Sequence, residues 1–240
     1  MTGAFGDVSR KYLLRAVDLS GWVTPVTAAL PEQIAALIVD QIQFGEIKPG
    51  EPIREQQLAD RFGVSRGPVR SALRLLVRDR LVVLNDNRGA TVRSLSDEDT
   101  IAIFHIRAEV SGMILRLAAA AEQKDPTALD AVRQGVELLI EIADSGEEQI
   151  GSYISVRRGV SILLSKLGGN AYLAKISAQL EHEIAVLWAA ILNPDRRKRT
   201  ARLWWEIYRT VRDGLPDEAD TRGRNLVLGG LDEVLRNART

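Results

Sequence analysis

The stretch FGVSRGPVR, residues 62–70, contains the signals that decide the fold of the N-terminal part of the chain. Gly63 suits the left-handed residue that commonly ends a helix. Ser65 is a favoured residue at the start of the next helix, and Pro68 is tolerated within a first helical turn. The stretch therefore predicts one helix, a tight turn and a second helix.

Helical spacing of apolar residues extends this pattern on both sides of the turn. A short helix is expected at 55–62, and a longer one between Pro31 and Gly45. The longer helix has an apolar face of Ile34, Leu37, Ile38 and Ile42. After the turn, one face is apolar and the opposite face has an arginine at every fourth residue. The apolar residues are Val69, Ala72, Leu73 and Leu76, and the arginines are Arg66, Arg70, Arg74 and Arg78.

The hydrophobic period changes after the second of these helices. Residues 81–84 form a short β-prone run, 85–89 a turn-forming cluster, and 90–93 a returning strand. A hairpin placed directly after a helix-turn-helix is the wing of a winged DNA-reading unit. We therefore expect a winged helix-turn-helix domain at 31–95, preceded by an N-terminal extension at 1–30.

The rest of the chain, 96–240, is expected to be helical throughout. Ser96 and Asp99 form a near capping box at its start. Breaks that contain Pro, Gly or Asn separate six expected helices, at 97–122, 126–143, 148–166, 170–192, 196–213 and 217–237. The predicted fold is mainly α, with an N-terminal winged helix-turn-helix followed by an all-helical bundle.

Composition excludes several classes of protein. The 240 residues contain no cysteine and two histidines, which excludes disulfides, thiolate chemistry and the usual four-ligand zinc site. No apolar run reaches the length of a membrane span, and the N-terminus lacks the apolar core of a signal peptide. We therefore expect a cytoplasmic protein with no membrane partner. No phosphate loop, nucleophile elbow or useful His–carboxylate cluster is present, which argues against an enzyme with catalytic residues.

The zero net charge hides a local excess of positive charge. Residues 61–93 carry eight arginines against Asp79 and Asp86. A solvated helical face would look the same from composition alone, but the winged layout favours a nucleic-acid interface. Arginine at a helix start can make paired contacts to guanine, Ser65 and nearby amides can hold a phosphate, and Gly89 would let the wing approach DNA closely.

The same residues resemble the DNA-binding domain of GntR-type bacterial transcription regulators. The similar segments are GEIKPG (45–50), IREQQLA (53–59), FGVSRGPVR (62–70), LRLL (73–76) and RGATV (88–92). The resemblance implies a set of base and phosphate readers: Arg54, Gln56, Ser65, Arg66, Gly67, Arg70, Arg88 and Gly89. The family usually has Thr at the position of Gly67, so this chain lacks one hydroxyl there.

The helical region resembles the FadR/FCD branch of that family, whose bundle senses ligands and forms dimers. The branch often holds a divalent metal with an Asp and three His, but their positions fall here on Arg157, Ser161, Trp204 and Asn225. These are poor ligands for a hard cation, so we expect neither a metal site nor a cofactor. Arg157 could instead take an acidic effector. The candidate effector-binding residues are Arg107, Tyr153, Arg157, Ser161 and Trp204. The alternative for Arg157 is an arginine that points to solvent, and the alternative for Tyr153 and Trp204 is an ordinary role in the hydrophobic core.

The resemblance implies a sequence-specific transcription regulator. We expect a repressor that binds double-stranded DNA at a palindromic operator as a homodimer and responds to a small acidic effector. The alternative is a ligandless architectural or partner-binding protein that uses the winged domain as an anchor. The basic run 196–199 is expected to be solvated, with a second nucleic-acid contact as the other possibility.

Overall fold

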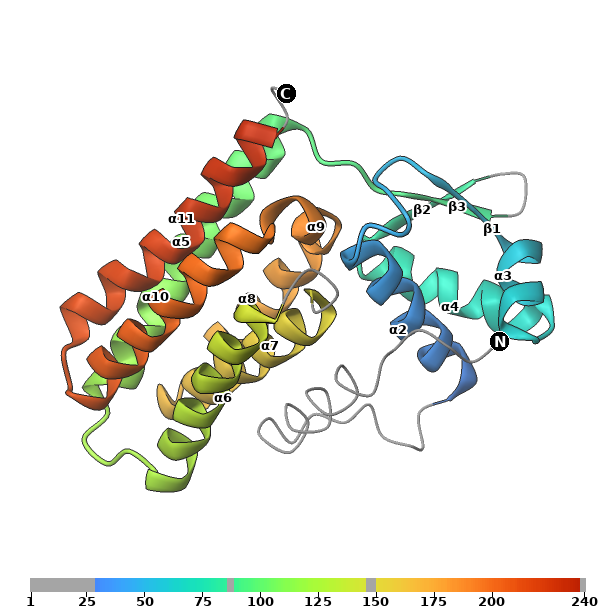
Figure 1. Cartoon of the computed structure of the whole chain (residues 1–240). Helices are drawn as coiled ribbons and strands as arrows, with labels where there is room; N and C mark the ends of the chain where they lie inside the picture. The colour runs from blue at the N-terminus through green and yellow to red at the C-terminus, as the bar shows by residue number, and fades with distance from the viewer. Residues whose placement is uncertain (1–28, 86–88, 146–149, 238–240) are drawn as a thin grey trace. The chain divides into compact units, whose positions relative to one another are not determined.

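A computed structural model of the chain describes residues 29–85, 89–145 and 150–237 (Figure 1). These residues divide into two compact units. The first, here called the winged unit, contains residues 29–103 together with 179–189. The second, called the helical unit, contains the described residues of 104–178 and 190–237.

The helices of the winged unit begin and end close to where the sequence places them. They are α2 (Leu30–Gln43), α3 (Glu55–Phe62) and α4 (Arg66–Arg78). Gly63 has a φ of 66° and ends α3, and Ser65 is the N-cap residue of α4. Ile34, Ile38 and Ile42 are buried as expected. Leu37 is not: it is 47% exposed, because it lies at the edge of the stripe centred on Ile38.

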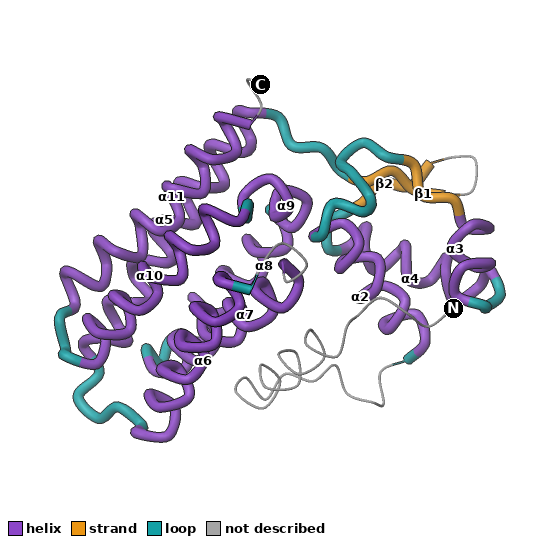
Figure 2. The backbone as a smooth tube through the Cα atoms, in the orientation of Figure 1, coloured by secondary structure: helices purple, strands orange, loops and turns teal. Residues whose placement is uncertain are grey.

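The wing is a three-stranded antiparallel sheet with strand order β1-β3-β2 (Figure 2, orange). The expected hairpin is present as β2 (Val82–Asn85) and β3 (Gly89–Val92). The sequence missed β1 (Pro52–Arg54), which pairs with β3 on the side away from β2. Three residues that begin with proline are too few to show an alternating pattern, so only the pairing reveals this strand.

A later segment of the chain, 179–189, completes the winged unit. The side chain of Glu183 is only 9% exposed and accepts hydrogen bonds from Arg80 and Arg93. Both arginines belong to the basic region of the sequence, but here they hold a carboxylate. The next three residues, 184–186, are all buried. One face of a regular helix cannot bury so many consecutive residues.

The helix expected at 170–192 is accordingly broken into three pieces. They are α8 (Ala171–Glu183), a 3₁₀ turn η2 (Ala185–Leu187) and α9 (Trp188–Ile191). The tighter turn brings the buried residues after Glu183 against α2 within the winged unit. Local spacing alone could not show this break, because its cause is a contact between distant parts of the sequence.

The helical unit is built on long helices that match the other expected ranges within a few residues. They are α5 (Asp97–Ala120, which starts in the winged unit), α6 (Pro126–Asp144), α7 (Ile150–Leu167), α10 (Pro194–Arg212) and α11 (Pro216–Asn237). Helix α6 packs against α7 and α10, and α10 also packs against α11. Asp125 and Asn193 cap α6 and α10 by accepting backbone N–H bonds. Among the described residues, no helix is both long and apolar enough to cross a bilayer.

Candidate nucleic-acid interface and buried arginine cluster

The arginine face of α4 is exposed to solvent. Val69, Ala72, Leu73 and Leu76 are buried on the opposite face, so the amphipathic pattern of the sequence is confirmed. Arg66, Arg70, Arg74 and Arg78 are all exposed. The helix thus presents a row of guanidinium groups while its apolar side anchors it in the winged unit.

Two of these arginines are held by side chains of α3. Arg66 donates from Nε to Oε1 of Gln56 at 2.5 Å. Arg70 donates from Nε and Nη2 to the two carboxylate oxygens of Glu55, at 3.0 and 2.9 Å. The hydrogen bonds to Glu55 and its negative charge raise the pKa of Arg70. The sequence suggested Gln56 and Arg70 as readers but did not reveal the role of Glu55, which is buried.

The other expected readers of the helix-turn-helix lie around the same helix starts. Arg54 is exposed and occupies the N-cap position of α3. Ser65 occupies the N-cap position of α4, but its hydroxyl makes no capping hydrogen bond there. Gly67 is exposed in the first turn of α4, and a Cβ built on it would approach only the Ser65 hydroxyl, at 4.0 Å. Space therefore does not require glycine at this position.

The two wing residues expected to read DNA differ in what the structure describes. Arg88 lies outside the described residues. Gly89 is buried, and a Cβ on it would lie 2.4 Å from the carbonyl oxygen of Ile53. Glycine is thus required where β3 approaches the end of β1. This reason differs from the close approach to DNA that the sequence suggested, and it depends on a strand that the sequence did not predict.

In the helical unit, a cluster of arginines and hydroxyls lies in the interior. Tyr153 and Arg157, one turn apart on α7, are buried. The Tyr153 hydroxyl lies 2.7 Å from the hydroxyl of Thr200 on α10 and donates to the backbone carbonyl of Arg197 at 3.3 Å. The Arg197 side chain is only 1% exposed. Of these, the sequence suggested Tyr153 and Arg157 and missed the two residues of α10.

Burial shifts the pKa values of this cluster. Desolvation and, after it, the positive charge of Arg107 together lower the pKa of Arg157 to about 9. The guanidinium of Arg107 is itself desolvated, although the residue as a whole remains partly exposed, and its pKa is lowered to about 10. Burial raises the pKa of Tyr153 to about 12. Like charges therefore meet in an environment that disfavours charge.

The remaining candidate effector residues lie on the same two helices. Ser161 follows Arg157 by one turn of α7 and is half-buried. Trp204 follows Thr200 by one turn of α10 and is buried, and its indole N–H has no hydrogen-bond partner among the described residues. Spacing back from Trp204 by helical turns would have found Thr200 and Arg197 as neighbours on one face.

These residues do not fit the metal site that the family often contains. A buried guanidinium and a buried indole, those of Arg157 and Trp204, stand at two of the positions where the resemblance would place metal ligands. In the part of the chain that the structure describes, no group of three or more His, Asp or Glu side chains is placed to hold an ion.

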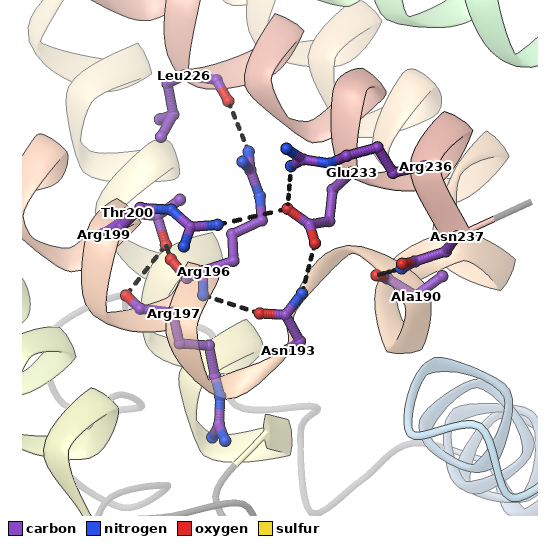
Figure 3. A network of polar contacts seen from close by, with 10 residues as sticks. All are labelled: Ala190, Asn193, Arg196, Arg197, Arg199, Thr200, Leu226, Glu233, Arg236 and Asn237. Atoms are coloured by element: carbon purple, nitrogen blue, oxygen red, sulfur yellow. Dashed lines mark hydrogen bonds and ion pairs between the residues drawn. The ribbon is translucent and has the colours of Figure 1, made fainter. Parts of the chain in front are cut away.

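The basic run at the start of α10 is not a solvated surface throughout (Figure 3). Arg196 and Arg197 are buried, which corrects the expectation for these two residues. Arg196 donates to the carbonyl of Leu226, 3.2 Å away on α11. Glu233 of α11 accepts hydrogen bonds from a ring of partners: Asn193, Arg199 and Arg236. The basic run thus joins α10 to α11.

Family comparisons agree with both units. The profile of the bacterial regulatory proteins of the gntR family matches residues 30–92, and the FCD domain profile matches residues 102–227. The chain belongs to the GntR family of bacterial regulators and carries an FCD domain. This GntR/FCD protein thus belongs to a family of bacterial regulatory proteins, which is not a class of enzymes.

Curated relatives match the GntR/FCD protein over part of its length. It is 38% identical over 97 residues to the uncharacterized HTH-type transcriptional regulator YdhC of Bacillus subtilis, covering 40% of this chain and 43% of the relative. It is 32% identical over 118 residues to a probable D-xylose utilization operon transcriptional repressor of Paenarthrobacter nicotinovorans, covering 49% and 51%. The chain thus spans about half the length of these relatives or less.

Solved structures share the fold of the GntR/FCD protein. Escherichia coli McbR/YncC superposes with a TM-score of 0.77 at 19% identity, covering 88% of this chain and all of the other. A putative GntR regulator from Rhodococcus sp. RHA1 superposes with a TM-score of 0.70 at 21% identity, covering 86% and 97%. At these identities, the similarity shows the common fold alone.

Proposed function

We propose that the protein acts in the cytoplasm as a repressor that binds a palindromic DNA operator as a homodimer. The observation that carries this proposal is the exposed arginine face of α4, the second helix of the helix-turn-helix. A helix start that carries arginine can enter the major groove and pair with guanine O6 and N7. The names of several relatives include the word repressor, which supports the direction of regulation.

The proposed DNA contacts are those that the sequence suggested. Exposure of Arg54, Gln56, Arg66 and Gly67 supports a role near DNA, and the Ser65 hydroxyl makes no capping bond that would compete with a phosphate. Arg70 is exposed but engaged by Glu55. The full proposed set is Arg54, Gln56, Ser65, Arg66, Gly67, Arg70, Arg88 and Gly89.

Selection of bound sequences from a random DNA library tests this proposal directly. One winged helix reads few bases, so two copies related by a two-fold axis should select two inverted half-sites. A two-fold symmetric consensus, and a dimer in solution by sedimentation, are the expected results. Selection of no consensus, or selection of a single half-site that a monomer binds, would contradict the proposal.

We infer that the effector is a small acid that binds near the buried arginines of the helical unit. Arg107 and Arg157 repel each other in a desolvated environment, and an anion placed between them would relieve this repulsion. Tyr153 and Ser161 supply hydroxyl groups on α7, the helix of Arg157, and Trp204 supplies an N–H group on α10. One relative is named a gluconate operon transcriptional repressor, and gluconate is an acid of this kind.

A thermal-shift screen over sugar acids, other organic acids and acyl-CoA compounds tests the effector. A ligand that binds only the folded protein raises the melting temperature, and the same ligand should change operator affinity. Burial of Trp204 favours the alternative, a ligandless regulator whose candidate site is filled by the indole ring. No stabilisation by any acid, with operator binding intact, would support that alternative.

A further inference from the structure

The first two arginines of α4 are held by α3 in chemically different ways. Arg66 is bonded through Nε to a neutral amide, that of Gln56. Arg70 is bonded through Nε and Nη2 to a carboxylate, that of Glu55, which is only 6% exposed. The two partners are adjacent residues in the first turn of α3. The start of one helix therefore gives successive arginines of the α4 face partners of different charge.

This difference decides how much charge and how many donors each arginine can offer to DNA. The Glu55 carboxylate neutralises the charge of Arg70 and uses two of its donor nitrogens. The amide of Gln56 leaves the charge of Arg66 intact. Of the Arg66 side-chain nitrogens, only Nε has a hydrogen-bond partner among the described residues, so both Nη groups remain available. Those two groups form the edge that pairs with guanine O6 and N7.

A third residue fixes the direction of the Gln56 amide. Its Nε2 donates to Oδ1 of Asp60 at 2.7 Å, one turn later on α3. A carboxylate can only accept, so the amide nitrogen must face Asp60. The amide oxygen then faces Arg66, where it can accept from Nε. The two hydrogen bonds that link Asp60, Gln56 and Arg66 are therefore both formed in only one orientation of the Gln56 amide.

We propose that Gln56 and Asp60 are positioning residues that set DNA sequence specificity through Arg66. They hold the Arg66 guanidinium so that its two terminal nitrogens face a guanine, whereas Glu55 makes Arg70 a brace between α3 and α4. Gln56 then acts on the base through Arg66, whatever contact its own side chain makes with DNA. This inference rests on the proposed function, since it requires an operator to which Arg66 binds.

The Asp60→Asn variant of the full-length protein separates positioning from simple charge. Its affinities for the selected operator and for random DNA are measured by fluorescence anisotropy at one salt concentration. Loss of a negative charge should strengthen binding to random DNA. Because asparagine can also donate, the amide of Gln56 is no longer fixed, and the ratio of operator to random affinity should fall by about fivefold or more. An unchanged ratio, with both affinities rising together, would overturn the proposal.

Matched variants control for charge and for side-chain loss. Asp79→Asn removes a carboxylate that pairs with Arg78 at the far end of α4, and it should leave the ratio unchanged. Gln56→Ala should lower the ratio as Asp60→Asn does, whereas Gln57→Ala, at the exposed neighbouring position, should not. Equal ratios for Gln56→Ala and Gln57→Ala would also overturn the proposal.

The same experiment keeps this inference distinct from the proposed function. If the unaltered protein selects no operator, the proposed function fails. If it selects an operator that Gln56→Ala and Asp60→Asn bind with the same preference, the proposed function stands and the positioning role fails. Circular dichroism and a melting curve for each variant exclude a loss of folding as the cause of a changed ratio.

Discussion

Arginine serves opposite purposes in the two units of this protein. On α4 of the winged unit, four arginines at a spacing of four residues are exposed. In the helical unit, Arg157 and Arg197 are 8% and 1% exposed. An exposed guanidinium keeps its hydration and can exchange it for a phosphate or a base, whereas a buried one must be stabilised by groups fixed in the fold.

The comparison shows that charged residues on a helix do not by themselves identify a solvent-exposed face. Arg66 lies opposite an apolar stripe that includes Val69 and Leu73, so its helix has one inner and one outer face. Arg196 and Arg197 lie in the first turn of α10, on the part of its surface that is buried in a helix packed against both α6 and α11, whereas Lys198 and Arg199 next to them are exposed. The position of an arginine relative to the packed sides of its helix therefore decides whether it remains exposed.

The largest expected effect comes from removing a buried charge. Desolvation and Arg107 disfavour the charged form of Arg157, and each unit by which a pKa is lowered corresponds to about 1.4 kcal/mol, so Arg157→Met should raise the free energy of unfolding by up to about 4 kcal/mol. The same variant should lose any stabilisation by acids. Urea denaturation, with and without an acid found in the screen, measures both. A variant that is less stable, or that still responds to the acid, would remove the contrast between the two arginine populations.

Alkaline titration tests the interior around Tyr153. The folded-state pKa is raised to about 12, so the unfolded chain loses this proton at lower pH than the folded protein. Stability therefore falls as the pH rises from about 10 to about 12, by about 3 kcal/mol for a two-unit shift. The difference in stability between the unaltered protein and Tyr153→Phe should shrink across this range. A constant difference would mean that the Tyr153 hydroxyl is not desolvated.

Two glycines of the winged unit provide a matched steric test. Gly89→Ala would place a Cβ 2.4 Å from a backbone oxygen of Ile53, and it should destabilise the protein by about 1–3 kcal/mol. Gly67→Ala meets open space within a helix and should stabilise it by about 0.4–1 kcal/mol. Melting temperatures compare the two. Equal effects of the same sign would show that the contact between β1 and β3 does not constrain Gly89.

The smallest effect is expected for an exposed arginine that is further along α4. Arg74→Ala should change stability by less than about 0.5 kcal/mol. If Arg74 contacts a phosphate, binding to all DNA should weaken alike, and the slope of log affinity against log salt should fall by about 1. Arg66→Ala should instead weaken operator binding by about 1–3 kcal/mol and relax the base preference. Identical behaviour of the two variants would remove the distinction between base reading and phosphate contact.

Much of the winged unit followed from local signals. Gly63 and Ser65 marked the turn, and the spacing of Val69 and Leu73 separated the inner from the outer face of α4. The hydrogen-bond partners of the α4 arginines could not be predicted from these signals, because Gln56 and Glu55 are both simply polar residues at a helix start. Their different bonds to Arg66 and Arg70 depend on how α3 packs against α4.

By itself, the sequence determined the elements that repeat a local rule: helices with one apolar side, caps at their starts, and a hairpin after the reading helix. Tertiary structure decided where groups from distant segments meet. Glu183 holds Arg80 and Arg93, β1 completes the sheet, and α10 brings Thr200 to Tyr153. The physical reason is that a helix cap or an apolar stripe acts within a few residues, whereas burial depends on which surfaces the whole chain brings together.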